Sequence, residues 1–291
     1  MRDYQYFTVD VFTDKRFGGN PLAVFPDAAG LDAATMQALA AELNYSETTF
    51  VLPPRDPANT AQVRIFNRTS EMPFAGHPNV GTAFVLAQLG RASGNVLRFE
   101  EISGLIAVRL GENGGAADID APQPLTIKES LPTKGIASCL SLGSESIVAT
   151  SHAPLRASVG VDFVLAEVAG EALSRAAPDL GAYHRLAAQF PQLEGRLSIF
   201  LYASEGADVR ARMFAPLAGT WEDPATGSAN ATLAALRLQL SGAGELAYRA
   251  VQGVEMGRPS HLSVRAWRSA DGVRAGVGGN CVSVFRGSIS L

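Results

Sequence analysis

One stretch of the sequence occurs twice. Residues 71–79 read Glu-Met-Pro-Phe-Ala-Gly-His-Pro-Asn and residues 222–230 read Glu-Asp-Pro-Ala-Thr-Gly-Ser-Ala-Asn, so Glu, Pro, Gly and Asn recur at a constant offset of 151 positions, from Glu71 to Glu222. An Arg-apolar-Phe triplet precedes each copy, and a run of small and apolar residues follows it. The short match alone could arise by chance, but the matched flanks favour an old duplication. We therefore expect two similar halves, each with a strand, a glycine turn and a buried helix.

The length and composition of the chain allow two such halves. With 291 residues, 47% apolar and 18% charged, the chain can form one large domain or two packed domains. The formal net charge is −4 and no block of like charges occurs, which predicts no binding to nucleic acid or to an anionic membrane. No apolar run reaches the length of about 18 residues that a membrane-spanning helix needs. The start of the chain is charged and then strand-like, unlike a signal peptide, so we expect a soluble cytoplasmic protein.

Short strands dominate both halves. Alternating residues predict a first strand over Tyr4–Phe12. Asp32 is a candidate cap for a helix that runs to about Leu43, with Asn44 as its end. The whole pattern predicts an α+β fold with two pseudo-symmetric domains, each a barrel-like, mostly antiparallel sheet around a central helix. We place the domains at residues 1–125 and 126–279, with the final strand near 280–291 as a candidate to pack back on the first domain.

The two turns are candidate anion sites. Gly76 and Gly227 let the backbone approach a ligand closely, and the helices that follow begin with N–H groups that lack an internal partner. If the halves face each other, both helix ends would hold one small carboxylate or enolate, without a metal or a cofactor. The alternative is that these glycines only allow tight helix packing.

The copies differ in the residues that carry chemistry. His77 in the first copy corresponds to Ser228 in the second, and Met72 corresponds to Asp223. Different polar groups at equivalent positions indicate a functional site rather than packing. The alternatives are a helix N-cap for Asp223 or Ser228 and a capping or core role for His77.

Glu47 is the candidate proton carrier. It begins an apolar strand that includes Phe50, Val51 and Leu52. Partial desolvation there would raise the pKa of its carboxyl toward neutrality, where a general base is most useful. The alternative is an exposed glutamate at a strand edge.

Cysteine and histidine patterns argue against other chemistries. Cys139 and Cys281 lie outside both turns, which disfavours a racemase with a thiol on each face of its substrate. The histidines outside the turns show no metal-ligand spacing; they are His152, His184 and His261.

Several motifs together resemble the phenazine-biosynthesis PhzF-like family. The strongest are Ser-Glu-Thr-Thr-Phe at 46–50, Pro-Phe-Ala-Gly-His-Pro at 73–78, Glu-Asp-Pro-Ala-Thr-Gly-Ser-Ala at 222–229 and Gln-Gly-Val-Glu-Met-Gly-Arg-Pro-Ser at 252–260. Asp-Val-Phe-Thr at 10–13 and Gly-Asn-Pro-Leu-Ala-Val at 19–24 fit as well. The match runs from near residue 7 to the last strand.

The resemblance implies a diaminopimelate-epimerase-like fold with the site between two domains. It also implies cofactor-free isomerisation by proton transfer, commonly in a homodimer and best known for trans-2,3-dihydro-3-hydroxyanthranilate. By motif, the catalytic residue is Glu47, and the residues that position a small carboxylate substrate are Gly76, His77, Asp223, Gly227 and Ser228.

The sequence leaves the substrate open. Asn79, Val80 and Trp221 stand where Thr, Leu and Gly are common in the family, and these departures bear on substrate shape. Two other functions remain as alternatives: an amino- or hydroxy-acid racemase or epimerase, and a non-catalytic protein that binds a small acid on the same scaffold.

Overall fold

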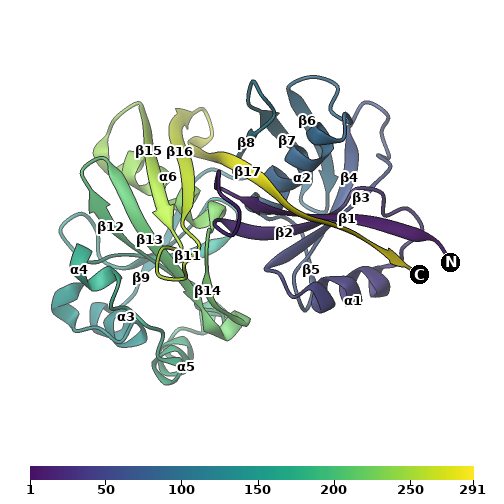
Figure 1. The fold of residues 1–291 in the computed structure, drawn as a ribbon. Helices are drawn as coiled ribbons and strands as arrows, with labels where there is room; N and C mark the ends of the chain where they lie inside the picture. The colour runs from purple at the N-terminus through teal and green to yellow at the C-terminus, as the bar shows by residue number, and fades with distance from the viewer. The chain divides into compact units, whose positions relative to one another are not determined.

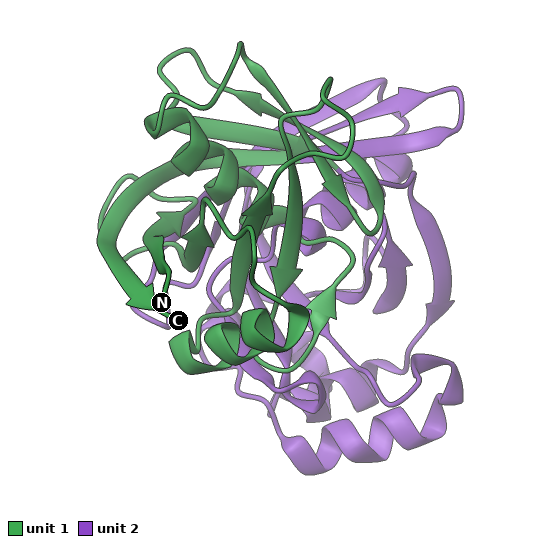
Figure 2. Ribbon diagram, turned by 90° about the vertical axis from the view of Figure 1, so that its right-hand side faces the viewer, with its two compact units in different colours: residues 1–120, 277–291 green, residues 121–276 purple.

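The structure, a computed structural model, describes residues 1–291 and divides into two compact units (Figure 2). The first unit comprises Met1–Asp120 and Val277–Leu291, and the second comprises Ala121–Gly276. The strand β17 (Gly272–Ser290) supplies residues to both units.

The first unit is a sheet that closes on itself around one helix. Hydrogen-bonded neighbours follow one another in the order β1, β2, β3, β4, β6, β7, β8 and β17, and β17 pairs with β1 to complete the ring. The elements of this unit are β1 (Asp3–Val11), β2 (Asn20–Phe25), α1 (Ala33–Leu43), β3 (Glu47–Leu52), β4 (Ala61–Phe66), β5 (Glu71–Met72), α2 (Gly76–Gln88), β6 (Val96–Glu101), β7 (Gly104–Leu110) and β8 (Ala116–Asp120).

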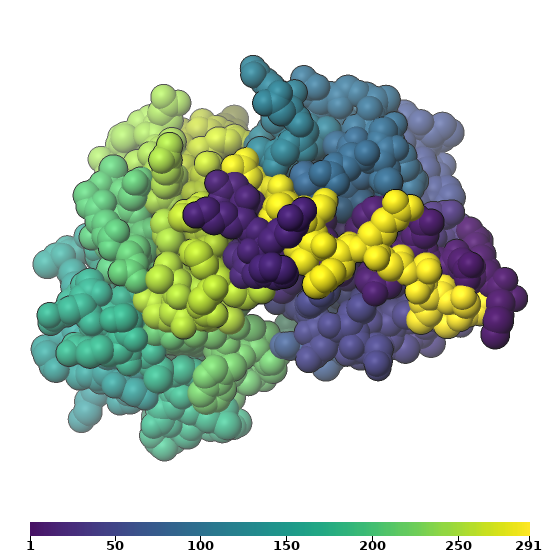
Figure 3. All heavy atoms as spheres, in the orientation of Figure 1, coloured from purple at the N-terminus to yellow at the C-terminus, as the bar shows by residue number.

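The closing seam joins the two ends of the chain. β17 runs antiparallel to β1, with Asp3 opposite Ser290 and Val11 opposite Cys281. In the space-filling view the end of the chain, in yellow, lies along the beginning, in purple (Figure 3). The first unit is therefore completed by residues from the end of the sequence.

The helix α2 forms the centre of the first unit. Its residues 76–86 are all buried, as a short helix that is apolar or small on nearly every face requires. Gly81 allows α2 to pack closely against β1 and β2, because a Cβ there would lie 2.6 Å from the Leu22 side chain and 2.8 Å from the Val11 side chain. The helix begins at Gly76, so Pro78 lies in the first turn, where a residue without an N–H leaves no helix hydrogen bond unmade.

The predicted helix from Asp32 is confirmed. In α1 the Asp32 carboxylate accepts a hydrogen bond from the Thr35 N–H at 2.8 Å, and Asn44 ends the helix in the left-handed conformation with φ 55°. Asp32 begins the helix because its carboxylate accepts a hydrogen bond from a free backbone N–H, and Asn44 ends it because asparagine tolerates a positive φ.

The second unit repeats the strand order of the first unit. Its strands pair in the order β9, β10, β11, β12, β13, β15 and β16, and β14 pairs with β13. The elements are β9 (Thr126–Ser130), α3 (Thr133–Cys139), β10 (Leu155–Ser158), β11 (Asp162–Glu167), α4 (Gly170–Leu173), α5 (Leu180–Gln189), β12 (Ile199–Glu205), β13 (Asp208–Ala215), β14 (Thr220–Asp223), α6 (Gly227–Ser241), β15 (Glu245–Gln252) and β16 (Ser260–Ser269), together with three short 3₁₀ turns at Ser144–Ser146, Pro191–Leu193 and Pro216–Ala218.

Strand directions match between the units. The parallel pairs β2–β3 and β4–β6 of the first unit correspond to β11–β12 and β13–β15 of the second, and the pairs between them are antiparallel (Figure 1). The helix α6 is buried in the second unit as α2 is in the first. The predicted fold class, α+β with two pseudo-symmetric barrel-and-helix units, is confirmed.

The final strand is longer than predicted. We expected it near 280–291, but β17 is continuous from Gly272 to Ser290. Gly278, inside this strand, serves close packing instead of a turn, because a Cβ there would lie 2.5 Å from the Cβ of Asp118.

Candidate active site

Glu47 is placed by the parallel pairing of β3 with β2. It is the first residue of β3 and lies opposite Leu22. Because β3 lies between β2 and β4, it is not an edge strand. The side chain is 16% exposed, which contradicts the alternative of an exposed glutamate at a strand edge.

Glu47 contacts His77, the second residue of α2. The distance from Glu47 Oε2 to His77 Nδ1 is 3.3 Å, and the His77 side chain is 6% exposed. A strand end and a helix start thus bring a carboxyl group and an imidazole together in one unit. Such a pair can hold and pass a proton.

Burial keeps the His77 imidazole neutral. Desolvation lowers the pKa of His77 to about 3, and a hydrogen bond to the backbone of Pro21 opposes this shift only in part. The contact with Glu47 is therefore not an ion pair at neutral pH. The neutral ring leaves one nitrogen as a donor and the other as an acceptor.

An arginine holds the first copy of the repeated turn. Arg64 of β4 donates from Nε and Nη2 to the two carboxylate oxygens of Glu71, each at 2.7 Å. The guanidinium also lies over the ring of Phe66, 5.1 Å from its centre. This two-point geometry fixes the strand β5 that leads into the turn.

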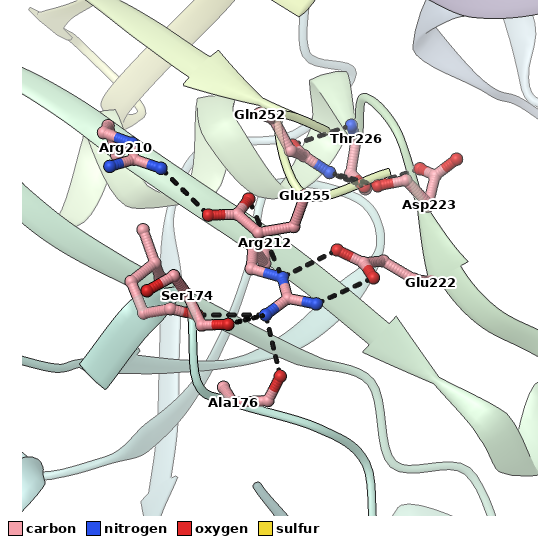
Figure 4. A network of polar contacts seen from close by, with 10 residues as sticks. Ser174, Ala176, Arg210, Arg212, Glu222, Asp223, Thr226, Gln252 and Glu255 are labelled. Atoms are coloured by element: carbon pink, nitrogen blue, oxygen red, sulfur yellow. Dashed lines mark hydrogen bonds and ion pairs between the residues drawn. The ribbon is translucent and has the colours of Figure 1, made fainter. Parts of the chain in front are cut away.

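The second copy has the same arginine clamp. Arg212 of β13 donates to the carboxylate of Glu222 at 2.8 and 2.9 Å, and its remaining nitrogen donates to the carbonyls of Leu173 and Ala176 at 3.0 and 2.7 Å (Figure 4). The Arg-apolar-Phe triplet and the repeated Glu are therefore the two sides of one structural clamp.

The repeated asparagine closes each turn. Asn79 Nδ2 donates to the Ala75 carbonyl at 3.0 Å, and Asn230 Nδ2 donates to the Thr226 carbonyl at 3.0 Å. Each carbonyl belongs to the residue just before the helix. The recurring Glu and Asn thus shape the turns, whereas the residues that differ between the copies carry the candidate chemistry.

Asp223 lies in a buried polar network in the second unit. It is 8% exposed, and its Oδ2 accepts a hydrogen bond of 2.6 Å from the Thr226 hydroxyl. Gln252 joins the network: its Nε2 donates to the Asp223 carbonyl at 2.8 Å, and its Oε1 accepts from the Thr226 N–H at 3.1 Å (Figure 4). The turn is fixed by side chains from two strands.

Neither Asp223 nor Ser228 is the helix N-cap. The residue before α6 is Thr226 and the residue before α2 is Ala75, and neither cap makes a side-chain hydrogen bond to its helix. The N-cap alternative for Asp223 and Ser228 is therefore wrong. Gly227 and Ser228 are the first two residues of α6, and the uncapped geometry supports the anion-site hypothesis for both helix starts.

Strand register identifies the counterpart of Glu47 in the second unit. The residue after Glu47 pairs with Phe66, and the residue after Ser198 pairs with Phe214. Phe66 and Phe214 close the equivalent Arg-apolar-Phe triplets. Ser198 therefore takes the place of Glu47, and the second unit offers no carboxyl group at that position.

The predicted residues form one set in each unit. The structure brings Glu47 into contact with His77 next to Gly76, and it places Asp223, Gly227 and Ser228 on one turn. The sequence reasoning missed the role of Gln252, although this residue heads the 252–260 motif. Gln252 ends β15, and a comparison of this strand end with the end of β6 in the first half would have indicated its role.

The environments of the two cysteines do not favour reactive thiolates. Cys139 and Cys281 are free and buried, and desolvation raises the pKa of each thiol to about 12. No group of three or more His, Cys, Asp or Glu side chains has the arrangement of a metal site. None of the helices is both long and apolar enough to cross a membrane.

The two units are similar α+β barrel-and-helix modules, with a buried carboxyl–imidazole pair in one and a buried aspartate turn in the other. The chain belongs to the family described as phenazine biosynthesis-like protein, whose model matches residues 9–287. It is 36% identical to trans-2,3-dihydro-3-hydroxyanthranilate isomerase of Pseudomonas chlororaphis, over 99% of this chain and 100% of that one.

Two further comparisons agree. An uncharacterized isomerase of Mesorhizobium japonicum is 37% identical, with 100% of each chain covered. The crystal structure of a PhzF-family phenazine biosynthesis protein of Bacillus anthracis matches the fold with a TM-score of 0.88 at 23% identity, over 100% of each chain. The protein is an isomerase of this family.

Proposed function

We propose that this isomerase acts on trans-2,3-dihydro-3-hydroxyanthranilate or a closely related small carboxylate, and that Glu47 moves the proton. The observation that carries the proposal is the 3.3 Å contact of Glu47 with a buried, neutral His77. The substrate class is supported by the relative from Pseudomonas chlororaphis, which matches over its full length.

The proposed step is a shift of one proton with no change in oxidation state. The Glu47 carboxylate takes a proton from a carbon next to a double bond, and the C–H electron pair enters the conjugated system. The protonated carboxyl then returns the proton to another carbon of that system. The bonds broken and formed balance, so no oxidant, reductant or cofactor enters the step.

The other residues hold the substrate in this proposal. His77 would orient the Glu47 carboxyl through its neutral ring, and Asp223 and Ser228 would contact the polar groups of the substrate. The helix starts at Gly76 and Gly227 would stabilise the negative charge that develops during proton removal.

A single proton carrier favours isomerisation over racemisation. Racemisation needs a base on each face of the substrate carbon, and the position equivalent to Glu47 holds Ser198, whose hydroxyl is a poor base without a partner that activates it. This serine supports the proton-shift isomerase over the racemase alternative. A catalytically silent binding protein would not need the buried carboxyl–imidazole pair.

The experiment is turnover of trans-2,3-dihydro-3-hydroxyanthranilate in deuterated solvent, followed by mass spectrometry and NMR. We expect isomerised product that carries deuterium at the newly protonated carbon to the extent that the protonated Glu47 carboxyl exchanges with solvent before it returns its proton. Binding without turnover or exchange would instead support the small-acid binding protein. Exchange with inversion at the same carbon would support the racemase.

We further propose a cytoplasmic homodimer that needs no cofactor. Two free, buried cysteines fit a reducing compartment. The dimer and the absence of a cofactor follow from the family resemblance. Sedimentation of the purified chain, and its activity after exhaustive dialysis against chelator, would test both statements.

A further inference from the structure

A buried carboxyl group in the first unit has no role in the site described above. Glu101 is the last residue of β6, and neither of its carboxyl oxygens contacts solvent or makes a hydrogen bond of ordinary geometry. The polar side chain that interacts with it is Asn79 of α2. Asn79 also fixes the turn before His77 through the Ala75 carbonyl.

Strand register gives the counterpart of Glu101. Gln62 of β4 pairs with Glu100, and Arg210 of β13 pairs with Val251. Gln62 and Arg210 are equivalent, because each lies two residues before the arginine of its clamp. The next residue along each partner strand is therefore also equivalent: Glu101 in the first unit and Gln252 in the second.

Gln252 shows what this position does. Its Oε1 accepts from Asn230 Nδ2 at 3.0 Å and from the Thr226 N–H at 3.1 Å, and its Nε2 donates to the Asp223 carbonyl at 2.8 Å. One amide thus supplies both an acceptor and a donor to the turn that begins α6. A carboxylate has acceptors only, whereas a protonated carboxyl has one of each.

We propose that Glu101 is held as the neutral acid and braces the turn of Gly76 and His77 as Gln252 braces the turn of Gly227 and Ser228. Its carbonyl oxygen accepts from Asn79, and its O–H donates to the backbone carbonyl of Met72, the counterpart of Asp223. Glu101 is then a positioning residue for His77, not a group that touches substrate.

The surroundings of Glu101 fit this state. Burial raises the pKa of Glu101 to about 8, and the Asn79 side chain opposes the shift only in part. The charged groups on the adjoining elements are engaged elsewhere or are neutral: Arg64 of β4 binds Glu71, Arg109 of β7 binds Asp118 and Asp120, Glu100 accepts from the Arg55 and Asp56 N–H groups, and His77 of α2 is neutral. No cation is there to hold a carboxylate.

A carboxyl NMR titration tests the protonation state without any substrate. In chain labelled with ¹³C at glutamate side-chain carboxyls, the Glu101 signal is identified by its loss in Glu101→Gln. We expect its midpoint above about pH 7, against about 4.3 for an ordinary glutamate. The neighbouring Glu100, whose pKa is lowered by three hydrogen bonds, is the internal reference. An ordinary midpoint for Glu101 in the folded chain overturns the proposal.

Variant kinetics test the positioning role, which rests on the proposed isomerase activity. Glu101→Gln keeps a donor and an acceptor, so we expect activity within about threefold of the parent. The activity of the parent should decline near pH 8, where Glu101 loses its proton, and Glu101→Gln should lack this decline. Glu101→Leu keeps the size only, so we expect kcat to fall at least about tenfold with the chain folded. Equal losses in both variants, or an unchanged pH profile in Glu101→Gln, overturn the role. Absent turnover by every form would count against the proposed function, while the titration still decides the state of Glu101.

Discussion

Glu47 Oε2 and His77 Nδ1 lie 3.3 Å apart, with both side chains largely removed from solvent. The two residues come from different elements, the start of β3 and the first turn of α2. A change at either residue should therefore report on the same proton transfer. Their different chemistry lets the two contributions be separated.

Replacement of Glu47 by glutamine should abolish most of the activity. The amide keeps the size and polarity of the side chain but does not carry the proton, and general acid–base catalysis contributes about 10²–10⁴-fold. We expect Glu47→Gln to lose at least about a hundredfold in kcat with an unchanged melting temperature. The exposed Glu42 of the same unit provides the control Glu42→Gln. Parent-like turnover in Glu47→Gln would exclude Glu47 as the proton carrier.

Burial of His77 should weaken the folded state in acid. Its pKa is 6.5 when unperturbed and about 3 in the folded chain. Above the higher value the ring is neutral in both states and contributes nothing. As the pH falls below it, the unfolded chain takes up a proton that the folded chain refuses, so stability is lost until the folded pKa is reached.

His77→Asn removes this difference between the folded and unfolded chains. We expect the free energy of unfolding of the parent, relative to this variant, to fall between about pH 6.5 and pH 3, by at most about 1.4 kcal/mol per pKa unit. Urea titrations across this range measure it. The exposed His184 gives the control His184→Asn. The same acid dependence in both variants would contradict the buried neutral state of His77.

The two arginine clamps should differ in their contribution to stability. The side chains of Arg212 and Glu222 are 8% and 12% exposed, against 22% and 24% for Arg64 and Glu71. Arg212→Ala leaves a nearly buried carboxylate unpaired, so we expect a loss of about 3–5 kcal/mol, and about 1–2 kcal/mol for Arg64→Ala.

Denaturant unfolding measures both losses. The double variant Arg212→Met with Glu222→Leu should recover much of the loss, because it removes both charges together. A double variant as unstable as Arg212→Ala would show that the carbonyls of Leu173 and Ala176, rather than the charge pair, depend on this arginine.

Loss of the Asp223 charge should weaken substrate binding more than the fold. Asp223→Asn can still accept the 2.6 Å hydrogen bond from the Thr226 hydroxyl, so the turn is retained. A hydrogen bond to a charged group contributes about 1.5–3 kcal/mol, so we expect kcat/KM to fall about 10–100-fold. Thr226→Val perturbs the same turn but keeps the charge, and it should lose less. The reverse order would make Asp223 a structural residue.

Local signals predicted much of the fold. Asp32 and Asn44 set the ends of α1 by the chemistry of their own side chains, which can be read from the sequence. The repeated Gly turns correctly indicated two similar units with a buried helix each. The continuity of β17 was missed because Gly278 resembles a turn residue, although the close approach of Asp118 is what requires the glycine.

The candidate site was predictable only where a motif names it. Glu47, His77 and Asp223 stand in short recognisable segments. The pairing of Glu101 with Gln252 depends on the register of strands far apart in the sequence, which no local pattern encodes. The burial that holds His77 neutral likewise arises from packing around α2, not from its neighbours in the sequence.

The strand β17 has a consequence for the order in which the chain can fold. The second unit is complete once residue 276 is in place, but the ring of the first unit closes only when 277–291 pair with β1. During synthesis, the first unit therefore stays open between β1 and β8 until the second unit has been made. A chain rearranged so that 277–291 precede β1 through a short linker would turn this late, long-range closure into a local hairpin, and it should fold faster.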